Sequence, residues 1–352
     1  MLGLEMVAKR ARSLMILSGV LTLASTSSSI VRAQEGTPGG HSKTLSNSTR
    51  RVVFDTNAFV GTGLAMPHWD NGYLVSRQVE NFDPETANVK LFDQSGAEAR
   101  SVKIWFPDST RVLVYSASAT SDGRVLVSGR ADDAKGDAAS FVALVNQSGK
   151  MTEVIQTDGF VPATTCLAPD GTVWSFGGTG YDVHSQPKPG DTLRHFDFKR
   201  GELSSFISRS SFLKGLRPGP EVHAYIQCGQ DEVMAYSSSA QLYIEMKYRG
   251  DKPQLYAATV PSDLKLTGFA ATGPRSVYGF FYHGGMAGLY YLVLDDANET
   301  AKWVAVKGTL GAYTMSGGVS GLWGSDRDNL IVSRTEDHIG ATALHWATPL
   351  DQ

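Results

Sequence analysis

The chain has 352 residues, long enough for one large all-β domain or for two average ones. Its 37 glycines, 10% aromatic residues and 19% charged residues are typical of a turn-rich globular protein and exclude a disordered or fibrous one. The formal net charge is −3 and the main part of the chain has no Lys/Arg cluster, which argues against nucleic acid as a partner.

The N-terminus has the layout of a secretory signal peptide. Basic residues at positions 9, 10 and 12 precede the apolar run Leu14–Ala24, and Val31–Ala33 offers a small-residue cleavage site. The apolar run is too short to span a bilayer comfortably, although an uncleaved anchor is the alternative. We expect removal of residues 1–33, a periplasmic or secreted protein, and no membrane span after cleavage. The removed segment holds four basic residues and one acid, so the formal charge would change from −3 to −6.

Residues 34–50 are rich in Gly, Ser, Thr and Asn and show no apolar periodicity, so they predict a flexible leader. Short strand patterns begin at Arg51 and continue to the end, which predicts one domain over residues 51–352. Strong hairpin signals occur at Asn71-Gly72, Asp122-Gly123 and Asp170-Gly171, each followed by a β-rich run. Weaker copies precede the runs that start at Glu232, Ser276 and Asn329.

These runs begin about 50 residues apart, and a period of that length built from short antiparallel strands is typical of propeller blades. The sequence therefore predicts an all-β, six-bladed β-propeller with four-stranded antiparallel blades near residues 60–107, 111–158, 161–210, 221–261, 264–309 and 312–348. The last blade is one strand short, and we expect Arg51–Phe54 to complete it and close the ring. A pair of β-sandwiches is the alternative.

The chain resembles the six-bladed β-propeller superfamily over about 300 residues, by these repeats. The resemblance also rests on Ala168–Trp174, APDGTVW, a sequence similar to the first hairpin of secreted bacterial propellers. That motif specifies a turn and a packed strand, so the resemblance implies a fold and no particular activity.

The longer connections between strands should share one face of such a fold. The sequence predicts them at Arg77–Asn88, Arg130–Ala139, Gly177–Asp191, Arg209–Pro220 and Tyr282–Gly288. Long loops on a rigid scaffold concentrate binding residues, so we expect the binding site on this face, around the central channel.

Individual candidates for binding are Tyr181 and His184 in a long loop, Glu221 and His223 at the start of an inner strand, and Tyr313 at the start of another. Glu221 and His223 lie two residues apart and therefore on one side of a strand. Each candidate also has a simpler interpretation, as a solvated loop or as a hydrogen-bonded pair that lines the channel without a ligand.

The six-bladed lactonases related to gluconolactonase hold a divalent metal with carboxylates that reach into the channel. Here the inner strands start at Arg111, Glu221, Thr267 and Tyr313, of which only one is acidic. The acids Asp132, Asp133 and Asp137 lack the spacing of a calcium loop and predict a charged hairpin tip. We therefore expect no metal and no cofactor. No HExxH, P-loop or dinucleotide fingerprint occurs, and the only GxSxG-like stretch, 317–321, lacks the nucleophile-elbow spacing.

These observations favour a binding or scaffolding module for a small molecule, a glycan or a protein. The alternative is a hydrolase or lyase, lactonase-like, with its site at the channel mouth.

Cys166 and Cys228 are the two cysteines, placed near the ends of inner strands of consecutive blades. An even count and an oxidising compartment favour a disulfide between them, and two buried thiols are the alternative.

Overall fold

The computed structural model describes residues 42–48, 50–59, 67–179, 190–208, 224–260, 264–283, 286–312, 318–334 and 341–351. They all belong to one compact unit, His41–Gln352. In these ranges the chain forms β-strands and one short 3-10 turn, Thr56–Ala58. The described segments contain no helix long and apolar enough to cross a membrane.

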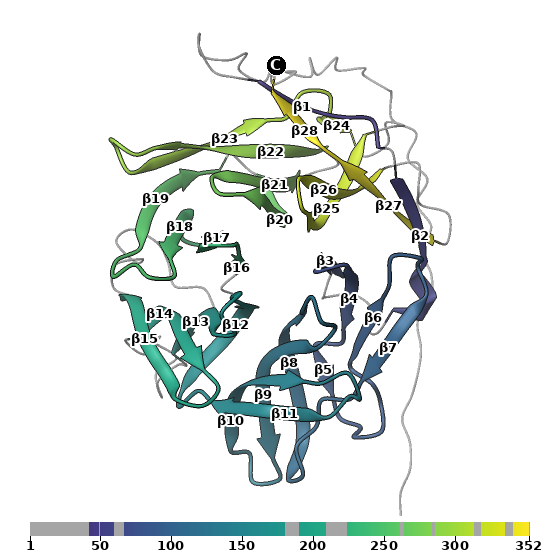
Figure 1. Ribbon diagram of the computed structural model, residues 1–352, viewed down its shortest axis with the longest axis vertical. Helices are drawn as coiled ribbons and strands as arrows, with labels where there is room; N and C mark the ends of the chain where they lie inside the picture. Colours follow the sequence, from purple (N-terminus) through teal and green to yellow (C-terminus); the bar gives the residue numbers. More distant parts are fainter. Residues whose placement is uncertain are drawn as a thin grey trace, which may run out of the picture. The chain divides into compact units, whose positions relative to one another are not determined.

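The strands follow one another in antiparallel groups in chain order (Figure 1). The first group is β3 (His68–Asp70), β4 (Tyr73–Arg77), β6 (Val89–Phe92) and β7 (Glu98–Val102). The second is β8 (Ser109–Ala119), β9 (Val125–Asp133), β10 (Ala138–Val145) and β11 (Met151–Gln156), with β5 (Glu80–Asn81) added to β8. The third is β12 (Phe160–Leu167), β13 (Val173–Thr179), β14 (Asp191–Asp197) and β15 (Gly201–Ser208).

The later groups repeat this order. They are β16 (Ala224–Cys228), β17 (Glu232–Ser237), β18 (Leu242–Lys247) and β19 (Gln254–Thr259), then β20 (Lys265–Gly273), β21 (Ser276–His283), β22 (Met286–Asp295) and β23 (Thr300–Ala305). The last consists of β25 (Val319–Asp326), β26 (Asn329–Arg334) and β27 (Ala341–Ala347), with β2 (Arg50–Asp55) paired to β27. Short pairs are formed by β1 (Lys43–Leu45) with β28 (Pro349–Asp351) and by β24 (Gly311–Ala312) with β22.

The second strand of each group begins at the residue that the turn signals predict: Tyr73, Val125, Val173, Glu232, Ser276 and Asn329. The first hairpin shows why. Asn71 (φ 46°) and Gly72 (φ 88°) both adopt the left-handed conformation, between the paired residues Asp70 and Tyr73. A two-residue hairpin turn of this kind requires positive φ at both positions, which Asn and Gly tolerate best.

Apolar side chains are buried between consecutive groups. Trp174 of β13 and Ile244 of β18 belong to one such cluster, and Leu91 of β6 and Val112 of β8 to another. Each group therefore packs its face on the next group along the chain, and burial of these faces supplies the main stabilising free energy.

Strand β2 connects the N-terminal part of the described chain to the last group. It runs antiparallel to β27, with Val52 opposite Leu344 and Val53 opposite Ala343. Phe54 is fully buried, and its ring centroid lies 6.5 Å from that of Trp69 on β3. One strand thus contributes to a core that includes residues of the first and the last groups.

The strand pairing differs from a set of separate four-stranded sheets. β19 pairs in parallel with β23, and β25 pairs in parallel with β3 at Gly324 and Trp69, so the described strands include a nine-stranded and an eight-stranded sheet. Gly324 makes the parallel pairing of β25 with β3 possible. A Cβ at this residue would lie 2.3 Å from the Trp69 carbonyl oxygen, so only glycine permits the two backbones to approach.

Two of the predicted long connections are shorter than expected. β9 continues to Asp133 and β10 begins at Ala138, so most of 130–139 is strand. The prediction of a loop over 282–288 is also wrong in its length, because β21 ends at His283 and β22 begins at Met286. Gly288 lies inside β22, where a Cβ would be 2.2 Å from Leu310 Cδ2, so this glycine makes room for packing and does not mark a loop.

The first strands of several groups contain β-bulges. Their register shifts fall at the positions of Tyr115, Ala163, Thr267 and Trp323. Glycines of the neighbouring second strands make room for two of them: a Cβ at Gly129 would lie 1.9 Å from the Leu113 oxygen, and one at Gly177 would lie 2.1 Å from the Val161 oxygen. A bulge changes the direction in which a strand presents its side chains.

Candidate functional site

A cavity of about 1060 Å³ is lined by residues of the first strands β3, β8, β12, β16, β20 and β25. Figure 1 shows where these strands lie. This volume lies at the upper end of ordinary small-molecule sites, which range over roughly 300–1,000 Å³. Many of the lining side chains carry hydrogen-bonding groups: Ser116, Ser118, Thr164, Thr165, Tyr225, Gln227, Thr267 and Ser325.

The bulged residues are part of this lining. Tyr115, Ala163, Thr267 and Trp323 all face the cavity. Simple alternation along β8 would place Tyr115 and Ser116 on opposite sides, yet both line the cavity, because the bulge inserts one extra residue between Val114 and Ser116. The bulges therefore decide which side chains a molecule in the cavity would meet.

Strand β3 presents two titratable side chains to the cavity. His68 and Asp70 alternate with Trp69, which is buried in the core on the other side of the strand. Burial, and after it the charge of Arg77, lowers the pKa of His68 to about 4, so the imidazole is neutral at neutral pH. Burial raises the pKa of Asp70 to about 7 against the effect of a hydrogen bond with the Ala119 backbone.

Arg77 ends β4 and lines the cavity at the end opposite the Asn71-Gly72 turn. Its Nη1 donates a hydrogen bond of 2.7 Å to the Val114 carbonyl oxygen, immediately before the bulge in β8. Burial lowers the pKa of Arg77 to about 10, so the side chain is still a cation at neutral pH.

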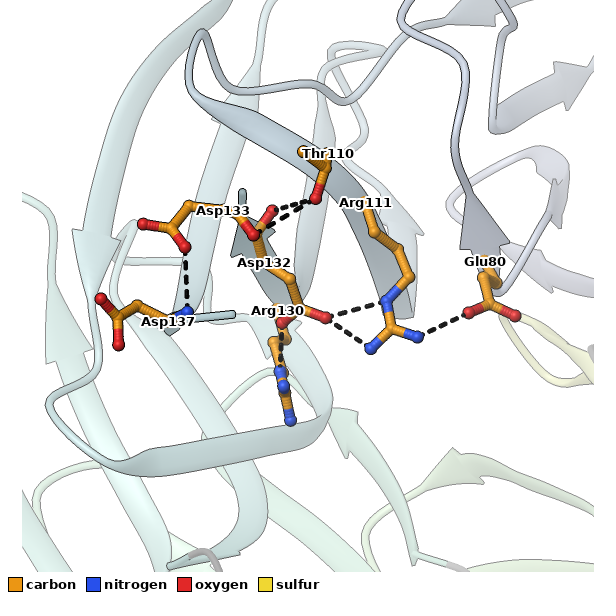
Figure 2. Close-up of polar contacts among 7 residues, drawn as sticks. All are labelled: Glu80, Thr110, Arg111, Arg130, Asp132, Asp133 and Asp137. Atoms are coloured by element: carbon orange, nitrogen blue, oxygen red, sulfur yellow. Dashed lines mark hydrogen bonds and ion pairs between the residues drawn. The ribbon is translucent and has the colours of Figure 1, made fainter. Parts of the chain in front are cut away.

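A separate ion-pair network lies at the start of β8 and the end of β9 (Figure 2). Asp132 accepts hydrogen bonds from Arg111 Nε (2.8 Å) and Arg130 Nε (2.5 Å), and Arg111 Nη1 also donates to Glu80 (3.0 Å). Burial alone would raise the pKa of Asp132, but the hydrogen bonds from Arg130 and Arg111 hold it below its usual range. This network fastens β5 and β9 to β8 and is not part of the cavity lining.

The remaining acids of the predicted hairpin tip stabilise the turn. Asp133 Oδ1 accepts hydrogen bonds from the backbone N–H groups of Lys135 (2.8 Å) and Asp137 (2.9 Å), and Figure 2 shows the Asp137 contact. This is an Asx-type turn, the structural role expected for these residues. Over the described ranges, no three His, Cys, Asp or Glu side chains come close enough together to hold a metal ion.

The predicted binding residues lie outside the described segments: Tyr181, His184, Glu221, His223 and Tyr313. Of the other predicted strand starts, Thr267 lines the cavity and Arg111 belongs to the ion-pair network. Sequence reasoning missed His68, Asp70, Arg77 and Tyr115. The alternation in His68–Asp70 just before the Asn71-Gly72 turn is a signal that could have identified the first two.

Cys166 of β12 and Cys228 of β16 form a disulfide in the structure, with Sγ atoms 2.03 Å and Cα atoms 5.5 Å apart. Both residues line the cavity. The bond joins the first strands of two consecutive groups, across 62 residues of sequence.

No family model and no curated protein matches this chain. Among solved structures it is similar to a luciferin-regenerating enzyme, with 14% identity, coverage of 85% of this chain and 95% of that one, and a TM-score of 0.44. It is also similar to the Dos1 propeller (10% identity, 78% and 66% coverage, TM-score 0.41) and to Hsv2 of Kluyveromyces lactis (9%, 68% and 71%, 0.37).

The antiparallel groups of this chain follow one another in sequence and place their first strands around one cavity, which is the strand arrangement of a β-propeller. We call the strand groups blades and this space the central cavity. At sequence identities of 9–14%, the similarity to these structures gives no information about the ligand or the activity of this chain.

Proposed function

We propose that this β-propeller is an exported binding module that holds a small polar molecule in its central cavity. The observation that carries the proposal is the cavity of about 1060 Å³, which is lined by hydrogen-bonding side chains from the first strands of successive blades. A large concave site with a few fixed polar groups is the usual form of a small-molecule site.

The polar lining is partly held in place before any molecule binds. Gln227 Nε2 donates to the Ala271 carbonyl oxygen (2.9 Å), and Gln227 Oε1 accepts from the Ala271 N–H (2.8 Å). Fixed polar groups lower the entropy cost of binding.

The cavity also presents aromatic rings. Tyr225 and Phe269 stack with ring centroids 5.7 Å apart, and both line the cavity together with Trp323. Aromatic faces beside hydroxyl and amide groups suit a molecule with both polar and apolar surfaces, such as a sugar. A glycan end or a small metabolite fits this lining better than a folded protein does.

The binding proposal predicts that a bulky side chain in the cavity abolishes ligand binding. Ala163→Trp replaces a half-buried lining residue with the largest side chain, while Ala257→Trp changes an exposed position on the outer strand β19. We would screen saccharides, polyols and organic acids by thermal shift and confirm hits by isothermal titration calorimetry. Hits should bind the wild type and Ala257→Trp equally and Ala163→Trp at least tenfold more weakly.

Equal binding by all three proteins would place the hits outside the cavity and contradict the proposal.

A second candidate function, a hydrolase or lyase, has one observation in its favour: Asp70, with a pKa of about 7, could exchange protons at neutral pH. Turnover of aryl esters or lactones that is lost in Asp70→Asn would support that candidate instead.

Export is the second part of the proposal. It rests on the signal-peptide pattern of residues 1–33, and the disulfide supports it because such bonds persist in oxidising compartments. We expect protein recovered outside the cytoplasm to begin at Gln34. Intact mass spectrometry measures this directly, and an exported species whose mass still includes Met1 would refute cleavage.

We also propose that the propeller has six blades and that β2 closes the ring. The pairing of β2 with β27 and the burial of Phe54 against Trp69 of the first blade support this closure. A closed ring leaves no unpaired edge between the first and the last blade.

A further inference from the structure

Arg77 lines the cavity, and the described residues include no carboxylate partner for it. Arg77 is half-buried, and its one hydrogen bond among the described residues goes to the Val114 carbonyl oxygen. Buried charges are normally paired, as Arg111 and Arg130 are with Asp132. The described ion pairs include no acid for Arg77, and its Nε and Nη2 donors are left for another group.

Tyr115 is a second donor that lines the cavity, and the charges of Arg130, Asp132 and Arg111 act on its phenol. It is the bulged residue of β8, next in sequence to the Val114 that accepts from Arg77, and its side chain lines the cavity. Its hydroxyl makes no hydrogen bond in the part of the chain that the structure describes. The bulge thus fixes the guanidinium through Val114 and directs the neighbouring phenol into the same cavity.

The acids that line the cavity lie at its other end. Asp70, Glu232 and Asp326 are strand residues that border the turns between first and second strands, whereas Arg77 ends a second strand. Along β4 the two ends are separated by four residue steps, or about 13 Å. His68, beside Arg77, is neutral at neutral pH, so the described residues that line this end of the cavity carry a net positive charge.

We propose that the small molecule of the proposed function carries an oxyanion, a carboxylate or a phosphate, which Arg77 binds and Tyr115 hydrogen-bonds. The inference rests on the proposed function and adds a chemical class to it. A guanidinium offers several N–H donors in one plane, and two of them match the two oxygens of a carboxylate or phosphate. The polar body of the molecule would then extend along the cavity toward Gln227.

Isothermal titration calorimetry with sodium phosphate, sodium succinate and neutral erythritol at constant ionic strength tests this inference. We expect the wild type to bind at least one of the two oxyanions and to bind it more tightly than erythritol. Arg77→Met should weaken oxyanion binding at least tenfold, and Tyr115→Phe several-fold. Arg200→Met is the control, because Arg200 is an exposed arginine that is paired with Asp197 and does not line the cavity.

The outcomes separate the inference from the proposed function. Binding of phosphate alone or of succinate alone supports the inference and identifies the oxyanion. A second outcome is that neither oxyanion binds, while neutral saccharides or polyols bind the wild type and Arg77→Met equally. This outcome overturns the inference and leaves the proposed function standing. If Arg77→Met does not fold, Tyr115→Phe and Arg77→Lys carry the test, and wild-type affinity in both overturns the inference. An absence of binding for every probe and panel compound overturns both.

Discussion

A variant that lacks residues 1–57 should melt far below the full-length protein and aggregate. This deletion removes β2, which pairs with β27 and buries Phe54 against Trp69 and Phe92. Without it, β27 becomes an exposed edge and the core that joins the first and last blades is opened. Differential scanning calorimetry and light scattering measure the two effects.

Finer changes locate the effect in β2. A variant that lacks only residues 1–47 keeps β2 and should melt much closer to the full-length protein. Phe54→Ala should lower the free energy of unfolding by about 3–5 kcal/mol, because it removes a fully buried ring. Val53→Ala on the same strand is the control. Its side chain is 44% exposed, so we expect a change of about 0.5 kcal/mol. Equal melting of the full-length protein and the variant without residues 1–57 would contradict ring closure by β2.

Removal of the disulfide should cost about 4 kcal/mol of stability. The bond between Cys166 and Cys228 closes a loop of 62 residues, and the chain-entropy relation gives about 4 kcal/mol for that length. We expect the double variant Cys166→Ala/Cys228→Ala to unfold at a lower denaturant concentration with a larger m-value, because the unfolded chain without the cross-link exposes more surface. Alanine keeps a small apolar side chain at both positions and so limits the change in packing.

Reductant provides the matched control for this prediction. Wild-type protein treated with dithiothreitol should unfold like the double variant, and the double variant itself should not respond to dithiothreitol. Alkylation of two thiols in denatured, unreduced wild-type protein would show that no bond forms in solution.

The strand order could be predicted from the sequence because short-range turn chemistry defines it. Asn71, Gly72 and Gly171 provide the positive φ that tight turns need, and the strands after them begin where predicted. The parallel pairing of β19 with β23 has no such local signal, because it depends on how two blades meet in space. The same holds for β25 and β3, which approach closely only because residue 324 has no side chain.

The candidate site was harder to predict because bulges change strand alternation. Alternation is enough to place His68 and Asp70 on the cavity side of β3. It fails for Tyr115, because the extra residue in β8 shifts the register by one position. Glycine at position 129 makes the bulge possible, yet an isolated glycine in a strand indicates either a bulge or a close backbone approach and does not name the residue affected.

A crystal structure of the protein soaked in its best-binding compound tests the central claim most directly, namely that the central cavity is the binding site. We expect density for the compound inside the cavity, with its oxyanion within hydrogen-bonding distance of Arg77 and Tyr115 and its body beside Gln227. Density for the compound only on an outer surface, with the cavity filled by ordered water, would contradict the claim.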